Sequence, residues 1–239
     1  MITTPAVPRT RAHRASRDPS LPGAVSVLAV TARPGQESTD LGGVLYAFAR
    51  AGAGLSLLAL TRGEAAAHNS GTGRLEAVRP WEVQLAASVL GIDEVAVASY
   101  RDGSLPEYPL GELAGRIGRS IRDRSADLVL VVAPEVGDRE DGAVARAARV
   151  AAEAAGIPAV AVTRPGEHGA WTVDLGVDAE LARAIQKSAV AAHASQSELL
   201  PSLIDRIDRL GRFESLRWLL FPEPIVAQPV HQNENLVTV

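Results

Sequence analysis

Polar side chains that could take part in catalysis or ligand binding follow the end of an apolar, β-branched run at 25–31. In the loop at 32–38, Arg33 and Gln36 come directly after this run, and a helical pattern begins near Ser38. In α/β sheets ligands bind at loops that follow the carboxyl ends of strands, so position alone makes this the candidate active-site loop. A guanidinium there could hold a carboxylate or phosphate through a forked contact, beside the helix N-terminus.

Carboxylates form a second set of candidates at strand ends. Asp102 lies in a Tyr-Arg-Asp-Gly-Ser loop, and Asp138 and Asp141 lie in the loop after a later apolar run. With Glu37, the latter two offer oxygen ligands for a hard cation such as Mg²⁺, although the charge of Arg33 opposes that use. Asp102 is also consistent with a turn carboxylate that hydrogen-bonds its own backbone.

Two further candidates lie outside these loops. Arg79, on a predicted helix, is either a ligand contact or half of an ordinary surface ion pair with Glu82 or Glu76. His68 lies in the small, polar stretch 65–73, which we predict to be a flexible lid over the site. A solvent-exposed loop histidine is the simpler interpretation of His68. No serine stands in a nucleophile-elbow sequence, which leaves Ser-His-Asp catalysis without support.

Composition narrows the function classes. The chain has 239 residues, 46% of them hydrophobic, and can bury a full core. A net charge of −4 gives no electrostatic reason to expect nucleic acid or an anionic membrane as a partner. The absence of cysteine excludes disulfides and thiolate chemistry, and Lys187 is the only lysine available for a Schiff base. With no signal-like or membrane-spanning run, we predict a cytoplasmic protein.

Apolar runs alternate with amphipathic helical patterns along the chain. Strands are predicted at 24–31, 55–61, 95–98, 127–132, 157–162 and, at a sheet edge, 171–175; helices are predicted at 38–51, 75–91, 110–123, 143–155, 179–192 and 199–210. This alternation predicts an α/β fold with a mainly parallel sheet. We expect one domain at 23–222, between a flexible N-terminal tail at 1–22 and an extended C-terminal tail at 223–239.

The predicted helix at 75–91 carries a row of apolar side chains. We expect one face to turn to the core, formed by Val78, Trp81, Leu85, Ala86 and Leu90.

The loop at 32–38 also carries a family resemblance. Its sequence, Ala-Arg-Pro-Gly-Gln-Glu-Ser, resembles the Ala-His-Pro-Asp-Asp-Glu-Ser signature of the PIG-L/LmbE-like N-deacetylases, zinc hydrolases that remove acyl groups from amino sugars and related amines. Further blocks match in order: Leu41-Gly42-Gly43, Thr61-Arg62-Gly63-Glu64, the loop at 100–105, Asp138–Asp141 and the helix at 187–196. The resemblance spans about 24–220 and implies a Rossmann-like three-layer α/β/α sandwich.

The residues that carry the family's chemistry are replaced at the matching positions. The first zinc ligand, a His, is Arg33; the general base, an Asp, is Gly35; the second ligand, an Asp, is Gln36; and the third, a His, is Asp141. Arginine has no lone pair for a metal and repels a dication, so we expect no zinc cofactor. Instead, Arg33 is expected to occupy the metal's space and to pair with Asp141 or Asp138.

The resemblance also implies roles for retained residues. Glu37 is expected to brace the loop and the start of the helix, and His193 to be structural. Asp102 matches a carboxylate that lines the family's sugar-binding pocket, and Arg79 matches an arginine that can reach substrate.

We therefore predict a divergent member of the family that has lost metal-dependent hydrolysis. It would bind a small polar, anionic or sugar-like molecule, or run a metal-independent reaction, with specialised biosynthesis as the setting suggested by family analogy. Two alternatives stay open: an amide hydrolase with a rebuilt metal site, and a non-catalytic partner of an active paralogue. A homo-oligomer is also open.

Overall fold

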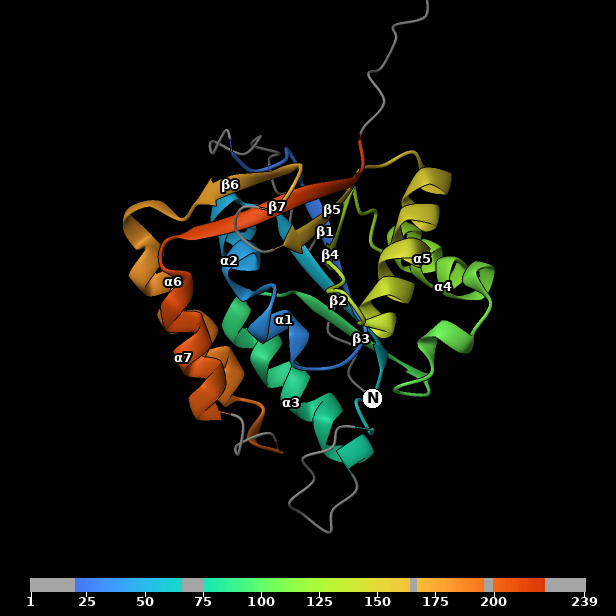
Figure 1. Ribbon diagram of the computed structural model, residues 1–239, viewed down its shortest axis with the longest axis horizontal. Helices are drawn as coiled ribbons and strands as arrows, with labels where there is room; N and C mark the ends of the chain where they lie inside the picture. The colour runs from blue at the N-terminus through green and yellow to red at the C-terminus, as the bar shows by residue number, and fades with distance from the viewer. Residues whose placement is uncertain (1–19, 66–74, 164–166, 196–199, 222–239) are drawn as a thin grey trace, which may run out of the picture.

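A seven-stranded sheet forms the centre of the molecule (Figure 1). The computed structural model describes residues 20–65, 75–163, 167–195 and 200–221. The strand order is β3-β2-β1-β4-β5-β7-β6, in which β1 to β5 are parallel and β7 is antiparallel to both of its neighbours. The strands are β1 Ser26–Thr31, β2 Gly54–Thr61, β3 Glu94–Tyr100, β4 Leu128–Val132, β5 Ala159–Thr163, β6 Ala170–Asp174 and β7 Phe213–Leu220.

Helices cover both faces of this sheet, which confirms the predicted three-layer α/β/α sandwich (Figure 1). They are α1 Gln36–Thr39, α2 Gly42–Ala51, α3 Leu75–Leu90, α4 Leu110–Asp123, α5 Arg139–Ala155, α6 Ala179–Ala191 and α7 Leu200–Leu210. One apolar core lies between the sheet and α2, α3 and α6, and a second lies between the sheet and α4 and α5. Within the described ranges, no helix is long and apolar enough to cross a membrane.

The strand β7 was not predicted from the sequence. Its sequence, Phe-Glu-Ser-Leu-Arg-Trp-Leu-Leu, carries a glutamate and an arginine, so it lacks the apolar run typical of a central strand. Yet β7 lies between β5 and the edge strand β6. Glu214 is buried in this position because Arg183 of α6 pairs with it. The prediction of an edge strand at 171–175 is confirmed by β6, one residue earlier.

Two helix boundaries differ from the predicted ones near the candidate site. The predicted helix at 38–51 is broken into α1 and α2, because the backbone N–H groups of Asp40 and Leu41 both donate to Gln36 O and close α1 after one turn. The helix predicted from residue 143 begins earlier, at Arg139. There the Asp138 carboxylate accepts a hydrogen bond from Asp141 N at 3.0 Å and caps the helix.

The predicted core face of α3 was wrong for three of its five residues. Trp81 is 78% exposed, and Val78 and Leu85 are exposed as well, whereas Ala86 and Leu90 are buried as predicted. The true inner face includes a buried arginine and a buried glutamate, Arg79 and Glu82. The inner face also carries the buried apolar residues Val83 and Ala87, so apolar side chains lie on both faces of α3 and hydrophobicity alone did not identify the inner one.

Two glycines give a stability test of the helical layer. Gly115 lies exposed within α4, where an added Cβ would meet only Arg119 Nη1 at 4.0 Å. Gly115→Ala should raise the free energy of unfolding by about 0.5–1 kcal/mol, because alanine loses less backbone entropy in a helix. Gly52 ends α2 at a φ of 91°, also with open space around it. Gly52→Ala should instead destabilise, because alanine resists that φ. Urea denaturation of both variants measures the two signs; equal shifts would contradict the argument.

Candidate functional site

The loop after β1 turns sharply at Gly35 before α1 begins. Gly35 has a φ of 106°, a backbone conformation that side-chain-bearing residues rarely adopt. Its N–H donates to Glu37 Oε2 at 2.8 Å, so the turn is fixed by the first residues of α1 themselves. This arrangement sets the direction in which Arg33 leaves the strand and the direction in which Gln36 leaves the helix.

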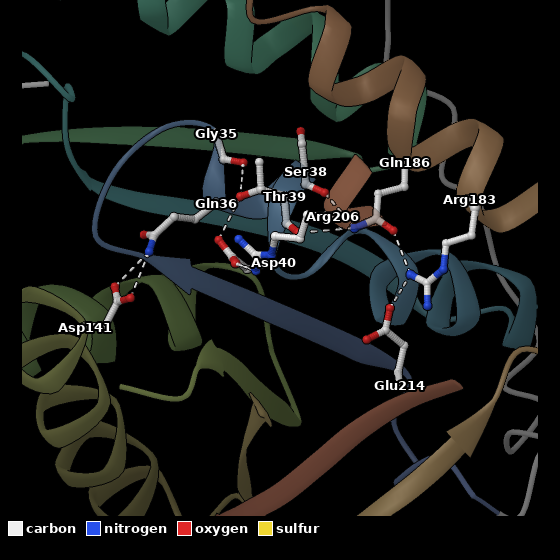
Figure 2. A network of polar contacts seen from close by, with 10 residues as sticks. All are labelled: Gly35, Gln36, Ser38, Thr39, Asp40, Asp141, Arg183, Gln186, Arg206 and Glu214. Atoms are coloured by element: carbon white, nitrogen blue, oxygen red, sulfur yellow. Dashed lines mark hydrogen bonds and ion pairs between the residues drawn. The ribbon is translucent and has the colours of Figure 1, made fainter. Parts of the chain in front are cut away.

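Gln36 connects the loop to α5 (Figure 2). Its Nε2 donates to Asp141 Oδ1 at 2.9 Å and to Oδ2 at 3.0 Å, and its Oε1 accepts from Ala32 N at 3.0 Å and from Arg33 N at 3.3 Å. Because the oxygen faces two backbone donors, the amide nitrogen must face the carboxylate. Both side chains are buried. Two of the positions matched to zinc ligands are therefore bonded directly to each other.

The Asp141 carboxyl group is unusually easy to protonate. Burial raises its pKa to about 6, and the nearby charge of Asp138 acts in the same direction. The Gln36 hydrogen bond and the charge of Arg33 oppose this rise without cancelling it. At neutral pH the site therefore holds a carboxylate that the surrounding protein stabilises only in part.

Arg33 does not pair with the carboxylates as expected. Its side chain is half-buried, and within the part of the chain that the structure describes it makes no ion pair with Asp141, Asp138 or any other acid. The predicted Arg33–Asp141 or Arg33–Asp138 pair was wrong, because the Gln36 amide takes the Asp141 oxygens and Asp138 caps α5. The Arg33 charge instead acts without direct contact: it opposes the burial-driven rise in the pKa of Asp141 and of Glu140.

A cavity of about 300 Å³ lies beside the capped start of α5. It opens between the loop after β3 and the loop after β4, and its lining includes three acids. The lining residues are Gly103, Pro106, Glu107, Gly137, Asp138, Arg139 and Glu140. Glu140, one of these acids, accepts a hydrogen bond from Leu105 N at 2.8 Å. Of the predicted candidates that the structure describes, only Asp138 lines this cavity.

Asp102 ties together the loops that follow β2 and β3. Its carboxylate accepts from Ala65 N at 2.9 Å and from Thr61 Oγ1 at 3.2 Å. These bonds cross from one strand end to the next, so the self-capping turn interpretation does not describe its contacts. Asp102 is 7% exposed, and its oxygens are engaged by the protein. Its place in a ligand pocket stays a prediction.

Arg79 is buried beneath the loop that follows β2 and does not lie on the surface. It is 1% exposed, and its Nη1 donates to Gly63 O. Burial lowers the pKa of Arg79, while the charges of Asp102 and Glu82 act to raise it. The alternative of a surface ion pair with Glu82 was therefore wrong, because the guanidinium is buried and donates to the Gly63 carbonyl.

Glu37 makes the bracing contacts that were expected of it. It is fully buried, and its Oε1 accepts from Ser38 Oγ at 2.9 Å and lies 2.7 Å from His193 Nε2. His193 thus fastens α1 to the end of α6, a structural contact. His68 and the predicted lid at 65–73 lie outside the described residues, apart from Ala65.

Two residues of this network were not found from the sequence, Arg183 and Gln186 of α6. Both are buried against α1 and β7. The available signal was a charged and an amide side chain three residues apart on the inward face of a predicted helix, but inward polar residues also occur without any role in a site.

Comparison with known proteins shows the family. The PIG-L model, described as GlcNAc-PI de-N-acetylase, matches residues 28–152. The chain belongs to the PIG-L family. No curated protein sequence matched.

Solved structures of two deacetylases and of a hydratase share the fold. A deacetylase of the teicoplanin biosynthesis pathway is 17% identical with a TM-score of 0.67, covering 81% of this chain and 96% of its own. The N,N'-diacetylchitobiose deacetylase of Pyrococcus horikoshii is 17% identical with a TM-score of 0.60, covering 83% and 84%. The 4-carboxy-2-hydroxymuconate hydratase of Pseudomonas putida KT2440 is 20% identical with a TM-score of 0.64, covering 83% and 97%.

The side chains at the PIG-L metal positions of this chain do not fit a zinc ion. Zinc in a catalytic site needs three protein ligands from His, Asp, Glu or Cys. Here one position is a guanidinium, one presents an amide nitrogen that donates to Asp141, and only Asp141 is anionic. Among the described residues, no three His, Asp or Glu side chains are grouped so that they could hold a metal. These side chains are poor zinc ligands because of their chemical types, and for that reason they do not match the zinc cofactor of the family.

Proposed function

We propose that this PIG-L family protein binds a small anionic or sugar-like molecule at the edge formed by the loop after β1 and the start of α5, without family-type zinc hydrolysis. The observation that carries this proposal is the pair of hydrogen bonds from Gln36 to Asp141. These bonds connect two positions that a metal would have to separate. They also leave the Arg33 guanidinium without an ion-pair partner among the described residues.

The Arg33 guanidinium, which has no ion-pair partner among the described residues, offers a charged contact to a ligand anion. Arg33 lies near the N-terminal end of α1. Its guanidinium can bind a carboxylate or phosphate by donating two parallel N–H hydrogen bonds. The hydroxyl groups of a sugar-like ligand would find acceptors in the acids of the adjacent cavity. One protein of the same fold is named as a hydratase of a carboxylated compound, so this architecture is not confined to deacetylation. A role in specialised biosynthesis is part of the proposal by family analogy.

The proposal is tested by anion binding that depends on Arg33. Titration calorimetry of small dicarboxylates and sugar phosphates should detect binding to the wild type. Arg33→Gln should weaken it by about tenfold or more, because a charge-assisted contact contributes roughly 1.5–3 kcal/mol. Arg122→Gln, an exposed change in the last turn of α4, is the matched control and should leave binding intact. Equal losses in both variants would mean that net charge and not this site attracts the anion.

A further inference from the structure

The short helix α1 carries the side chains of the candidate site but cannot hold its own position. It has four residues and makes a single turn, so most of its backbone groups lack partners within the helix. Contacts with other elements must therefore fix the position of α1. Gln36 fastens one end to α5, and His193 fastens Glu37 to the end of α6.

Gln186 supplies the contact at the carboxyl-terminal end of α1 (Figure 2). Its Nε2 donates to Ser38 O at 3.0 Å and to Thr39 O at 3.3 Å. These are terminal carbonyls of the kind that a helix leaves unsatisfied, and Gln186 is fully buried, so water does not reach its side chain.

Arg183 fixes which way the Gln186 amide points. Its Nη1 donates to Gln186 Oε1 at 2.7 Å and to Glu214 Oε1 of β7 at 2.5 Å, as Figure 2 shows. Because a guanidinium can only donate, it selects the amide oxygen and leaves the amide nitrogen for α1. Gly42 leaves room for this arrangement, since a Cβ there would lie 2.7 Å from Gln186 Cγ.

We infer that Gln186 is a positioning residue that holds α1 by its terminal carbonyls and so keeps the Gln36 side chain on Asp141. A continuous chain of contacts runs from Glu214 through Arg183 and Gln186 to α1, and from α1 to Asp141 (Figure 2). The inference deepens the proposed function and rests on it for the meaning of the Gln36–Asp141 contact. The test of this inference uses no ligand. The inference and the proposed function can therefore fail independently of each other.

Hydrogen exchange measured by NMR tests the inference at the Gln36 side chain. The reporters are the Gln36 side-chain NH₂ group and the amide of Ala32, which donates to Gln36 Oε1. In Gln186→Leu, both should exchange about tenfold faster or more than in a control of similar global stability, because α1 opens locally. Ile121→Ala is that control: it truncates a buried side chain of α4, in the apolar core on the face of the sheet opposite to Gln186.

A second variant guards against loss of folding. Gln186→Glu keeps the size of the side chain and its bond to Arg183, but it removes the donor to Ser38 and Thr39. It should show the same local acceleration. Exchange at Ala32 that matches Ile121→Ala in both Gln186 variants would overturn the inference. If neither variant folds, Gln186 supports the whole domain and not α1 in particular, and the inference is equally wrong.

Discussion

Replacing Arg33, Gln36 and Asp141 together with His, Asp and His is expected to create a zinc site in this protein. The three positions lie at one edge of the sheet, and two of them are already in hydrogen-bond contact. The triple variant removes a repelling guanidinium and supplies the three ligands that a catalytic zinc site needs. Zinc affinity should rise by roughly 10³-fold or more over the wild type, since metal binding to preformed ligands contributes many kcal/mol. Elemental analysis after dialysis and zinc titration of both proteins measure the change.

The change at Gly35 is kept as a separate step. Gly35→Asp would add the family's base, but the φ of 106° at this position strains any residue with a side chain. The triple variant therefore reports on metal binding alone, and the fourth change reports on hydrolysis of an N-acetyl amino sugar. Gln36→Asp alone serves as the control, because it sets two carboxylates against each other without completing a site. A folded triple variant that takes up no metal would mean that the loops are misaligned with the family. Stoichiometric zinc in the purified wild-type protein would contradict the proposed function.

The fold was predictable because its signals are local and repeated. Buried parallel strands are apolar on both faces, so β1, β2 and β4 could be located from composition alone. The strand β7 could not be located in this way, because it buries Glu214, whose partner Arg183 lies 31 residues away in the sequence. An inward polar residue reads as a surface residue until its partner is known.

The sequence was enough to predict which loops form the candidate site, but not which side chains within it contact each other. The strand-end positions brought Gln36 and Asp141 together as expected for one edge of a sheet. Which group would contact Asp141 could not be derived, because a long, flexible Arg33 and a short, buried Gln36 compete for the same carboxylate. The amide prevails in the structure because its oxygen is held by two backbone donors, which fixes its nitrogen toward α5 at little further cost in side-chain entropy.

Removing Arg183 is expected to cause the second large effect, a loss of about 3–5 kcal/mol in the free energy of unfolding for Arg183→Met. The Arg183 and Glu214 side chains are 7% and 5% exposed, so methionine leaves an uncompensated buried carboxylate. Burial already raises the pKa of Glu214 even with Arg183 beside it. Arg212→Met is the matched control on a neighbouring pair, because Arg212 and Asp174 are both solvent-exposed and their pairing contributes little. Urea denaturation at neutral pH measures both variants.

The pH dependence of Arg183→Met separates lost charge pairing from lost packing. Burial raises the pKa of folded Glu214, and loss of Arg183 raises it further. The protonated form is then favoured by folding, so its contribution is full below the unfolded pKa and is lost as pH rises through the folded pKa. The deficit of Arg183→Met should therefore be largest near pH 8 and shrink toward pH 5, and adding Glu214→Gln should recover most of it at neutral pH. A deficit that does not change with pH, with no recovery in the double variant, would assign the loss to packing around Gln186 and β7 rather than to the buried charge.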